Sequence, residues 1–208
     1  MGSRKWWGLV AVLAIAPVCY AFPTNAQLNK MSTPELLKLQ AQERAKLAHL
    51  DAKAAAQGNA LAQFNLGVDY GTGRGVPKDY AKAIYWFHKA ARQGNTASEN
   101  SMGVAYEDGL FVPKNHQRAV YWWQKAAAQG STKAMINLGY FYGDGPVVPK
   151  GFVQAYKWFA LAKNAARPGS TMYSVISTKI RQVSRSMSPG QIAQAQAMAA
   201  SWTKAHEK

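Results

Sequence analysis

A repeat with a period of 36 residues is the feature of this sequence that most restricts its fold. Three copies follow one another without gaps, and a half repeat, from Lys53 to Gly58, precedes them. The clearest columns are Leu66-Gly67, Met102-Gly103 and Leu138-Gly139; Tyr70, Tyr106 and Tyr142; Ala83, Ala119 and Ala155; and Trp86, Trp122 and Trp158. A period in this range indicates a solenoid, in which each unit packs only against its neighbours.

Each copy predicts two helices, because apolar residues recur at helical spacing in both halves. We expect the first, helix A, over residues 60–71, 96–107 and 132–143, and the second, helix B, over 80–92, 116–128 and 152–165. Cap residues stand at these boundaries: Asn59, Asn95 and Ser131 before helix A; Asp79, Asn115 and, as a weaker cap, Gly151 before helix B; and Gly58, Gly94 and Gly130 after helix B. Each of these glycines is followed at once by the cap residue of the next helix A, and this short connection forces the two helices to fold back as antiparallel neighbours.

Glycine also recurs inside helix A, as Gly67, Gly103 and Gly139. Glycine in a helix interior costs about 1 kcal/mol relative to alanine. Its repetition predicts that helix B approaches so closely at this column that a side chain would block the contact.

These features predict an all-α fold, a right-handed superhelical solenoid of antiparallel helix pairs with capping helices at both ends. A helix starting at Thr33-Pro34-Glu35 would cover the first repeat, and helices over about 170–186 and from the capping box at Ser188 would cover the last. The expected segments are a signal peptide, 1–26; an N-terminal capping helix and half repeat, 27–59; three repeats, 60–95, 96–131 and 132–167; and C-terminal capping helices, 168–208.

The first segment is typical of a secretory signal peptide. Arg4 and Lys5 precede an apolar run of about thirteen residues, which is too short to cross a bilayer as a helix. We expect cleavage after Ala26 or, alternatively, after Ala21; an uncleaved anchor and a lipoprotein start at Cys19 are weaker alternatives. The mature chain is therefore expected to be exported, periplasmic or secreted, with no transmembrane span after signal removal.

Composition and motif spacing exclude several other classes. The chain is 48% hydrophobic and 12% aromatic, which excludes disorder throughout. One Cys and four scattered His offer no metal-ligand spacing. Ser201-Trp202-Thr203-Lys204 matches the S-x-x-K motif of a serine nucleophile, but its K-T-G partner is missing, and Lys204 complements a helix dipole. We predict no catalytic residue, no metal site and no cofactor.

Residues 62–94 fit the pattern of a known repeat family almost completely. Residues 98–130 fit with departures, such as Phe111 in place of glycine, and residues 134–166 keep Trp158 but lose the final glycine. In these segments the chain resembles the Sel1-like repeat family, a branch of the tetratricopeptide-like αα solenoids, as an exported bacterial member. The resemblance implies a non-enzymatic adaptor or scaffold in protein complexes.

The resemblance also indicates where a protein partner or peptide segment would bind, because helix A lines the concave side of tetratricopeptide-like stacks. The candidate contacts are the helix A positions that leave the core phase: Phe64, Asn65, Val68, Asn100, Val104, Glu107, Ile136, Asn137 and Tyr140. Asn65, Ser101 and Asn137 share one column, and they would bond either to a partner's backbone or to a neighbouring repeat. Three and a half repeats form a short groove, so we expect a ligand segment of roughly ten residues or fewer.

The aromatic columns have two interpretations. Exposed rings would form a stacking platform for sugars or bases, whereas the helical period of Trp86, Trp122 and Trp158 favours packing in the core. The neighbouring Trp123 lies outside that phase and, if exposed, is a candidate contact residue.

The strongly basic composition supports an alternative function. The chain has 25 Lys and Arg against 10 Asp and Glu, a formal net charge of +15. Arg167, Lys179, Arg181 and Arg185 form a candidate patch for an anionic envelope polymer, either lipopolysaccharide or peptidoglycan. Solubility alone also explains the charge, and the export signal disfavours nucleic acid. Salt should release a ligand from such a patch more readily than from an aromatic groove, because exposed charges are screened beyond about 8 Å.

Overall fold

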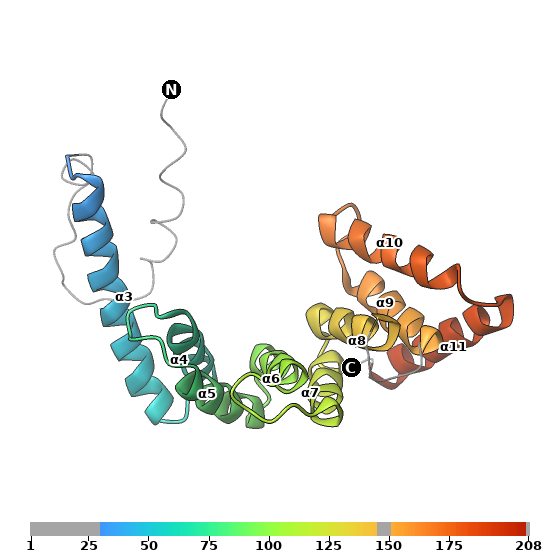
Figure 1. Ribbon diagram of the computed structural model, residues 1–208, viewed down its shortest axis with the longest axis horizontal. Helices are drawn as coiled ribbons and strands as arrows, with labels where there is room; N and C mark the ends of the chain where they lie inside the picture. Colours follow the sequence, from blue (N-terminus) through green and yellow to red (C-terminus); the bar gives the residue numbers. More distant parts are fainter. Residues whose placement is uncertain (1–29, 145–150, 207–208) are drawn as a thin grey trace. The chain divides into compact units, whose positions relative to one another are not determined.

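The computed structural model describes residues 30–144 and 151–206, and this part of the chain is helical with no strand (Figure 1). The helices are α3 (Thr33–Ala56), α4 (Ala60–Thr72), α5 (Tyr80–Arg92), α6 (Thr96–Asp108), α7 (His116–Ala128), α8 (Thr132–Asp144), α9 (Phe152–Ala165), α10 (Thr171–Ser184) and α11 (Pro189–His206). The predicted signal segment and its cleavage sites lie outside the described residues. The described residues divide after Gln40 into two units: the start of α3 belongs to the first, and the repeats belong to the second.

The predicted caps are present at the helix ends. The side chains of Asn59, Asn95 and Ser131 accept bonds from the backbone N–H groups of Ala62, Ser98 and Ala134. Asp79 and Asn115 cap α5 and α7 in the same way, whereas Gly151 makes no side-chain cap. The glycines that end each helix are left-handed as expected, with φ of 94° at Gly58, 83° at Gly94 and 86° at Gly130. Local sequence therefore sets where each helix begins and ends.

The helices pack as the pairs α4–α5, α6–α7 and α8–α9, and the glycine column lies at their contact. A Cβ atom built on Gly67 would lie 2.7 Å from the ring of Phe87. Cβ atoms on Gly103 and Gly139 would overlap the rings of Trp123 and Phe159 in the same way. The prediction that a side chain in this column would block helix B is confirmed. The blocking rings are those directly after the repeated tryptophan.

The repeated tryptophans are buried to different depths. Trp158 is 1% exposed and Trp122 is 8% exposed, and both belong to one continuous core that runs through the second and third repeats. Trp86 is only half-buried, against a smaller cluster formed by Ala55, Ala62 and Leu66. Trp123 is 4% exposed and part of the core, so it is not the exposed contact residue that its phase allowed.

The C-terminal helices cover α9, which lies between α10 and α11 (Figure 1). Trp202 of α11 meets Trp158 edge to face, with ring centroids 4.8 Å apart. The ammonium of Lys157 lies 4.3 Å from the Trp158 ring and 4.7 Å from the Trp202 ring. Ser188 and Gln191 form the predicted capping box at the start of α11. The last helix is thus held by an aromatic pair with a lysine against it.

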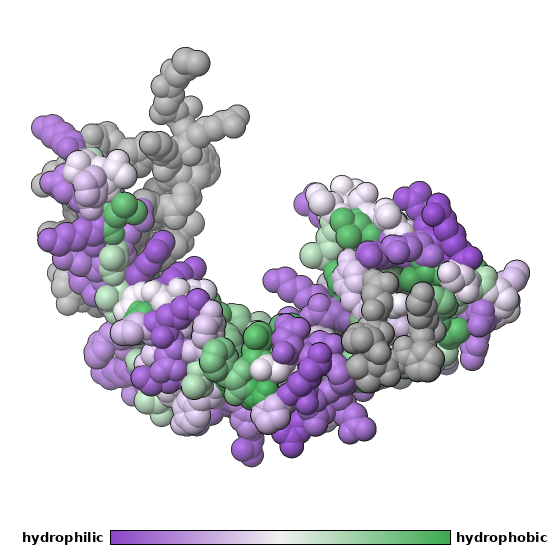
Figure 2. All heavy atoms as spheres, viewed as in Figure 1, coloured by the Kyte–Doolittle hydropathy of each residue, from purple (hydrophilic) through white to green (hydrophobic). Residues whose placement is uncertain are grey.

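Phe111, which stands where the family pattern has glycine, has a left-handed backbone with φ of 56°. Gly75, its counterpart in the first repeat, has φ of 76° and would place a Cβ atom against the backbone of Arg44. The Phe111 ring instead stacks on Tyr80 with centroids 4.8 Å apart. Both rings are exposed, and Figure 2 shows hydrophobic residues at the surface over α5 and α6. Phe111 therefore stacks against the preceding repeat while its backbone has a conformation that is unfavourable for phenylalanine.

Glu99 is a fully buried carboxylate inside the second repeat. Gln129 donates from Nε2 to its Oε2 atom at 2.6 Å, and Lys125 Nζ lies 3.3 Å from its Oε1 atom. In the first repeat the equivalent pair is uncharged, because Gln93 Nε2 donates to Gln63 Oε1 at 2.7 Å. Burial raises the pKa of the Glu99 carboxyl from its ordinary value of 4.5, and Lys125 acts in the opposite direction.

This raised pKa predicts a pH-dependent cost in stability. Folded Glu99 keeps its proton to a higher pH than unfolded Glu99, so the free energy of unfolding falls as the pH rises from 4.5 through the folded pKa and stays lower above it. Glu99→Gln should abolish this loss and make the variant more stable at pH 7 by about 1 kcal/mol, with little difference near pH 4. Lys125 is 40% exposed, so its ammonium remains hydrated when the Glu99 carboxylate is removed.

Thermal unfolding midpoints between pH 4 and pH 8 test this prediction. Gln63→Glu is the matched reverse control, since it places a carboxylate at the same position of the first repeat and should lower stability at pH 7. If the stability of Glu99→Gln relative to the parent protein were no higher at pH 7 than at pH 4, the assignment would be wrong.

Candidate functional site

A cavity of about 340 Å³ opens beside α6 and α8 in the second and third repeats. It is lined by Val104, Glu107, Asp108, Trp123, Asn137, Tyr140 and Phe141. Its volume is at the lower end of the roughly 300–1,000 Å³ typical of ligand sites, so it has room for one or two side chains of a partner. We call it the helix-A cavity, because six of its seven lining residues come from the A helices α6 and α8.

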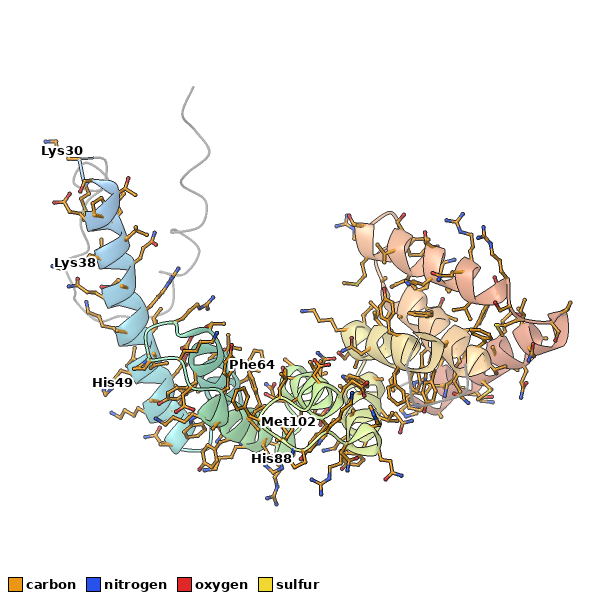
Figure 3. All side chains as sticks on the ribbon, viewed as in Figure 1. Lys30, Lys38, His49, Phe64, His88 and Met102 are labelled. Atoms are coloured by element: carbon orange, nitrogen blue, oxygen red, sulfur yellow. The ribbon has the colours of Figure 1, made fainter. Side chains whose placement is uncertain are left out.

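Four of the nine predicted contact residues line this cavity: Val104, Glu107, Asn137 and Tyr140. A fifth, Asn100, is bonded to one of them, since it accepts from Asn137 Nδ2 at 3.0 Å. The remaining four, Phe64, Asn65, Val68 and Ile136, are half-buried on α4 and α8 and do not line it. Figure 3 labels Phe64 on α4 and His88 on α5, which lie on different sides of that pair.

The polar column of Asn65, Ser101 and Asn137 makes bonds within the chain. Asn65 lies beside the carboxyl of Asp51: burial raises the pKa of Asp51, and Asn65 acts in the opposite direction. Ser101 donates to the carbonyl of Ala97, and Asn137 donates to the second repeat as described. Intramolecular bonding therefore accounts for these side chains, while Asn137 Oδ1 keeps no partner within the described residues.

Two carboxylates in the last turn of α6 line the helix-A cavity. Glu107 Oε2 lies 2.7 Å from Nδ1 of His116, and Asp108 is exposed. The C-terminus of a helix is the negative end of its dipole and favours cations. Two acidic residues there raise the local negative potential, and the last turn of α6 holds no basic residue to offset it.

Charge is segregated between the two kinds of helix. The A helices α4, α6 and α8 have Lys133 as their basic residue, and their described carboxylates are Asp69, Glu99, Glu107 and Asp108. The B helices α5, α7 and α9 carry no carboxylate, and their basic residues are Lys82, Lys89, Arg92, Arg118, Lys125, Lys157 and Lys163. A chain that is basic overall therefore has one acidic row of helices.

Sequence reasoning missed two residues of the cavity, Asp108 and Phe141, and it named Trp123 as a contact residue only if exposed. Trp123 is instead buried, and its indole N–H has no hydrogen-bond partner in the described part of the chain. Phe141 of α8 contacts Trp123 of α7, with ring centroids 6.1 Å apart. Counting charges separately for helix A and helix B would have indicated Asp108; Phe141 gave no signal in one sequence.

The four residues of the predicted basic patch are not gathered at one point. Arg167 precedes α10 and Arg185 follows it, so a helix of 14 residues, about 21 Å long, separates them. Arg181 is exposed near the end of α10 and bonds to Thr178. Lys179 is half-buried, with its ammonium 4.9 Å from the ring centroid of Tyr140. No observation favours this patch over the helix-A cavity as the binding site.

Within residues 30–144 and 151–206, no group of three or more His, Cys, Asp or Glu is placed to hold a metal ion. No helix in these same ranges has the length and hydropathy needed to span a membrane.

A stack of antiparallel helix pairs of equal length defines the class: an α-helical repeat protein of the solenoid type. The chain belongs to the Sel1 repeat family, whose model matches residues 60–95, 96–131 and 132–166, just over half of the sequence. Sel1 repeats generally mediate protein–protein interaction, which implies a protein partner. The comparison with curated proteins gave no significant match.

Two solved structures share this fold. One is c5321, a protective antigen of uropathogenic Escherichia coli with an SLR fold, at 32% identity and a TM-score of 0.65 over 76% of this chain. This chain spans 32% of the length of that one. The other is a Sel1 repeat protein from Oxalobacter formigenes, at 24% identity and a TM-score of 0.59, covering 89% of this chain and 90% of that one.

Proposed function

We propose that this protein is an exported, non-enzymatic scaffold of the bacterial envelope that binds a segment of a partner protein on the side formed by helices A. The helix-A cavity carries the proposal. It joins two repeats, it combines aromatic rings with polar groups, and four contact residues predicted from the repeat phase line it. Export rests on the N-terminal sequence pattern alone.

The residues around the cavity are suited to a peptide. Asn137 is half-buried, and its Oδ1 atom is an acceptor for a backbone N–H. The half-buried ring of Tyr140 provides apolar surface for side chains. Binding through these groups requires no covalent bond to be made or broken.

A triple substitution tests the proposal. The variant Asn100→Ala, Glu107→Ala and Tyr140→Ala should lose at least nine-tenths of the partner recovered by crosslinking and affinity capture from periplasmic extract. The three positions lie in or beside the cavity, and none is fully buried, so the circular dichroism spectrum should keep its helical shape.

The matched control removes three exposed side chains from helices B, in the variant Tyr85→Ala, Tyr121→Ala and Gln124→Ala. It should capture the partner as well as the parent protein does. Equal capture by the two triple variants, with both folded, would rule out the helix-A side as the binding surface.

A further inference from the structure

We propose that the helix-A cavity selects a basic segment, and that a lysine or arginine side chain of the partner enters it. The inference rests on the proposed function and specifies the chemistry of its ligand. It runs against the net charge of +15, which by itself predicts acidic ligands.

The first argument is the position of the carboxylates. Glu107 and Asp108 lie where α6 ends, so their charges add to the negative end of the helix dipole. Such positions normally favour Lys or Arg, and acidic residues there are unfavourable for the isolated helix. A bound cation would reverse this, because it would contact both the carboxylates and the end of the helix.

The second argument is the ring chemistry beside these carboxylates. Trp123, Tyr140 and Phe141 line the same cavity, and aromatic faces attract ammonium and guanidinium groups. Tyr140 already receives one such contact from Lys179, at 4.9 Å. The apolar stem of a lysine or arginine would also cover the half-buried ring of Tyr140.

His116 already contacts one of the two carboxylates. Its Nδ1 atom lies 2.7 Å from Glu107 Oε2, so this oxygen has a partner within the chain. Asp108 is the next residue of the same turn, and it lines the cavity as well. We therefore expect Asp108 to contribute most to the attraction of a cation.

Two labelled peptides of opposite charge test the inference with the purified protein. Both have ten residues and the same apolar positions; one has two lysines where the other has two glutamates. Fluorescence anisotropy should show that the lysine peptide binds at least tenfold more tightly than the glutamate peptide. Absent or equal binding of the two peptides would overturn the inference, and preference for glutamate would favour the basic patch near α10.

Matched variants separate a local site from general electrostatics. Glu107→Gln with Asp108→Asn should weaken the lysine peptide about tenfold. Glu35→Gln with Glu43→Gln makes the same change in net charge on α3 and should leave its affinity within twofold. Equal weakening by the two double variants would overturn the inference. If the lysine preference fails while the triple variant still loses its partner, the helix-A side remains the binding surface. Only the proposed basic character of its ligand is then wrong.

Discussion

Gly103→Ala should destabilise the protein by about 1–3 kcal/mol, although alanine is the better helix former. A Cβ atom at this position would overlap the indole ring of Trp123. That ring is buried between α6, α7 and α8, so either the ring must leave its packed position or the helix pair must separate. Urea unfolding followed by circular dichroism measures the shift in midpoint.

Gly71→Ala is the control, because it makes the same chemical change in α4 with the opposite expected sign. A Cβ atom on Gly71 would meet the nearest side-chain atom, on Ala83, at 3.7 Å, which is ordinary contact. Replacing glycine by alanine there should stabilise the protein by about 0.5–1 kcal/mol. If Gly103→Ala unfolds at the same urea concentration as the parent or a higher one, the close approach of the helices is wrong.

Trp158→Ala should cost about 3–5 kcal/mol, a large part of the 5–15 kcal/mol that typically separates folded from unfolded chains. The ring is 1% exposed, and it contacts Trp202 of α11 and the ammonium of Lys157. Its loss should leave a cavity and release α11 from α9. Hydrogen exchange in α11 should therefore rise together with the fall in the unfolding midpoint.

Trp86→Ala removes the same residue from the same column of the first repeat. Trp86 is half-buried against a small cluster, so the expected cost is about 1–2 kcal/mol, without faster exchange in α11. A cost equal to that of Trp158→Ala would mean that the repeats contribute equally to stability and that the size of the core around each does not matter. Repeat arrays unfold in parts, so both variants should be compared at several probes.

Helix ends, pairing and repeat length could be predicted because their causes lie within a few residues of one another. Asn59 caps the helix that follows it, Gly94 ends the helix before it, and neither needs a distant partner. The period carries this local information through all three copies. The glycine column likewise predicted a close contact, though the period alone did not name the ring that fills it.

The burial of Trp123, the path of α11 over α9 and the helix-A cavity could not be predicted from the period. Each depends on which side chains of different helices meet, and on the space left once they have packed. Trp123 is out of phase with the repeated tryptophan, yet it is buried because Gly103 leaves room for its ring. The same packing places Glu107 and Asp108 of one repeat beside Tyr140 of the next. Short-range chemistry along the chain was thus enough for the repeat architecture, whereas the site arises only where neighbouring repeats come into contact.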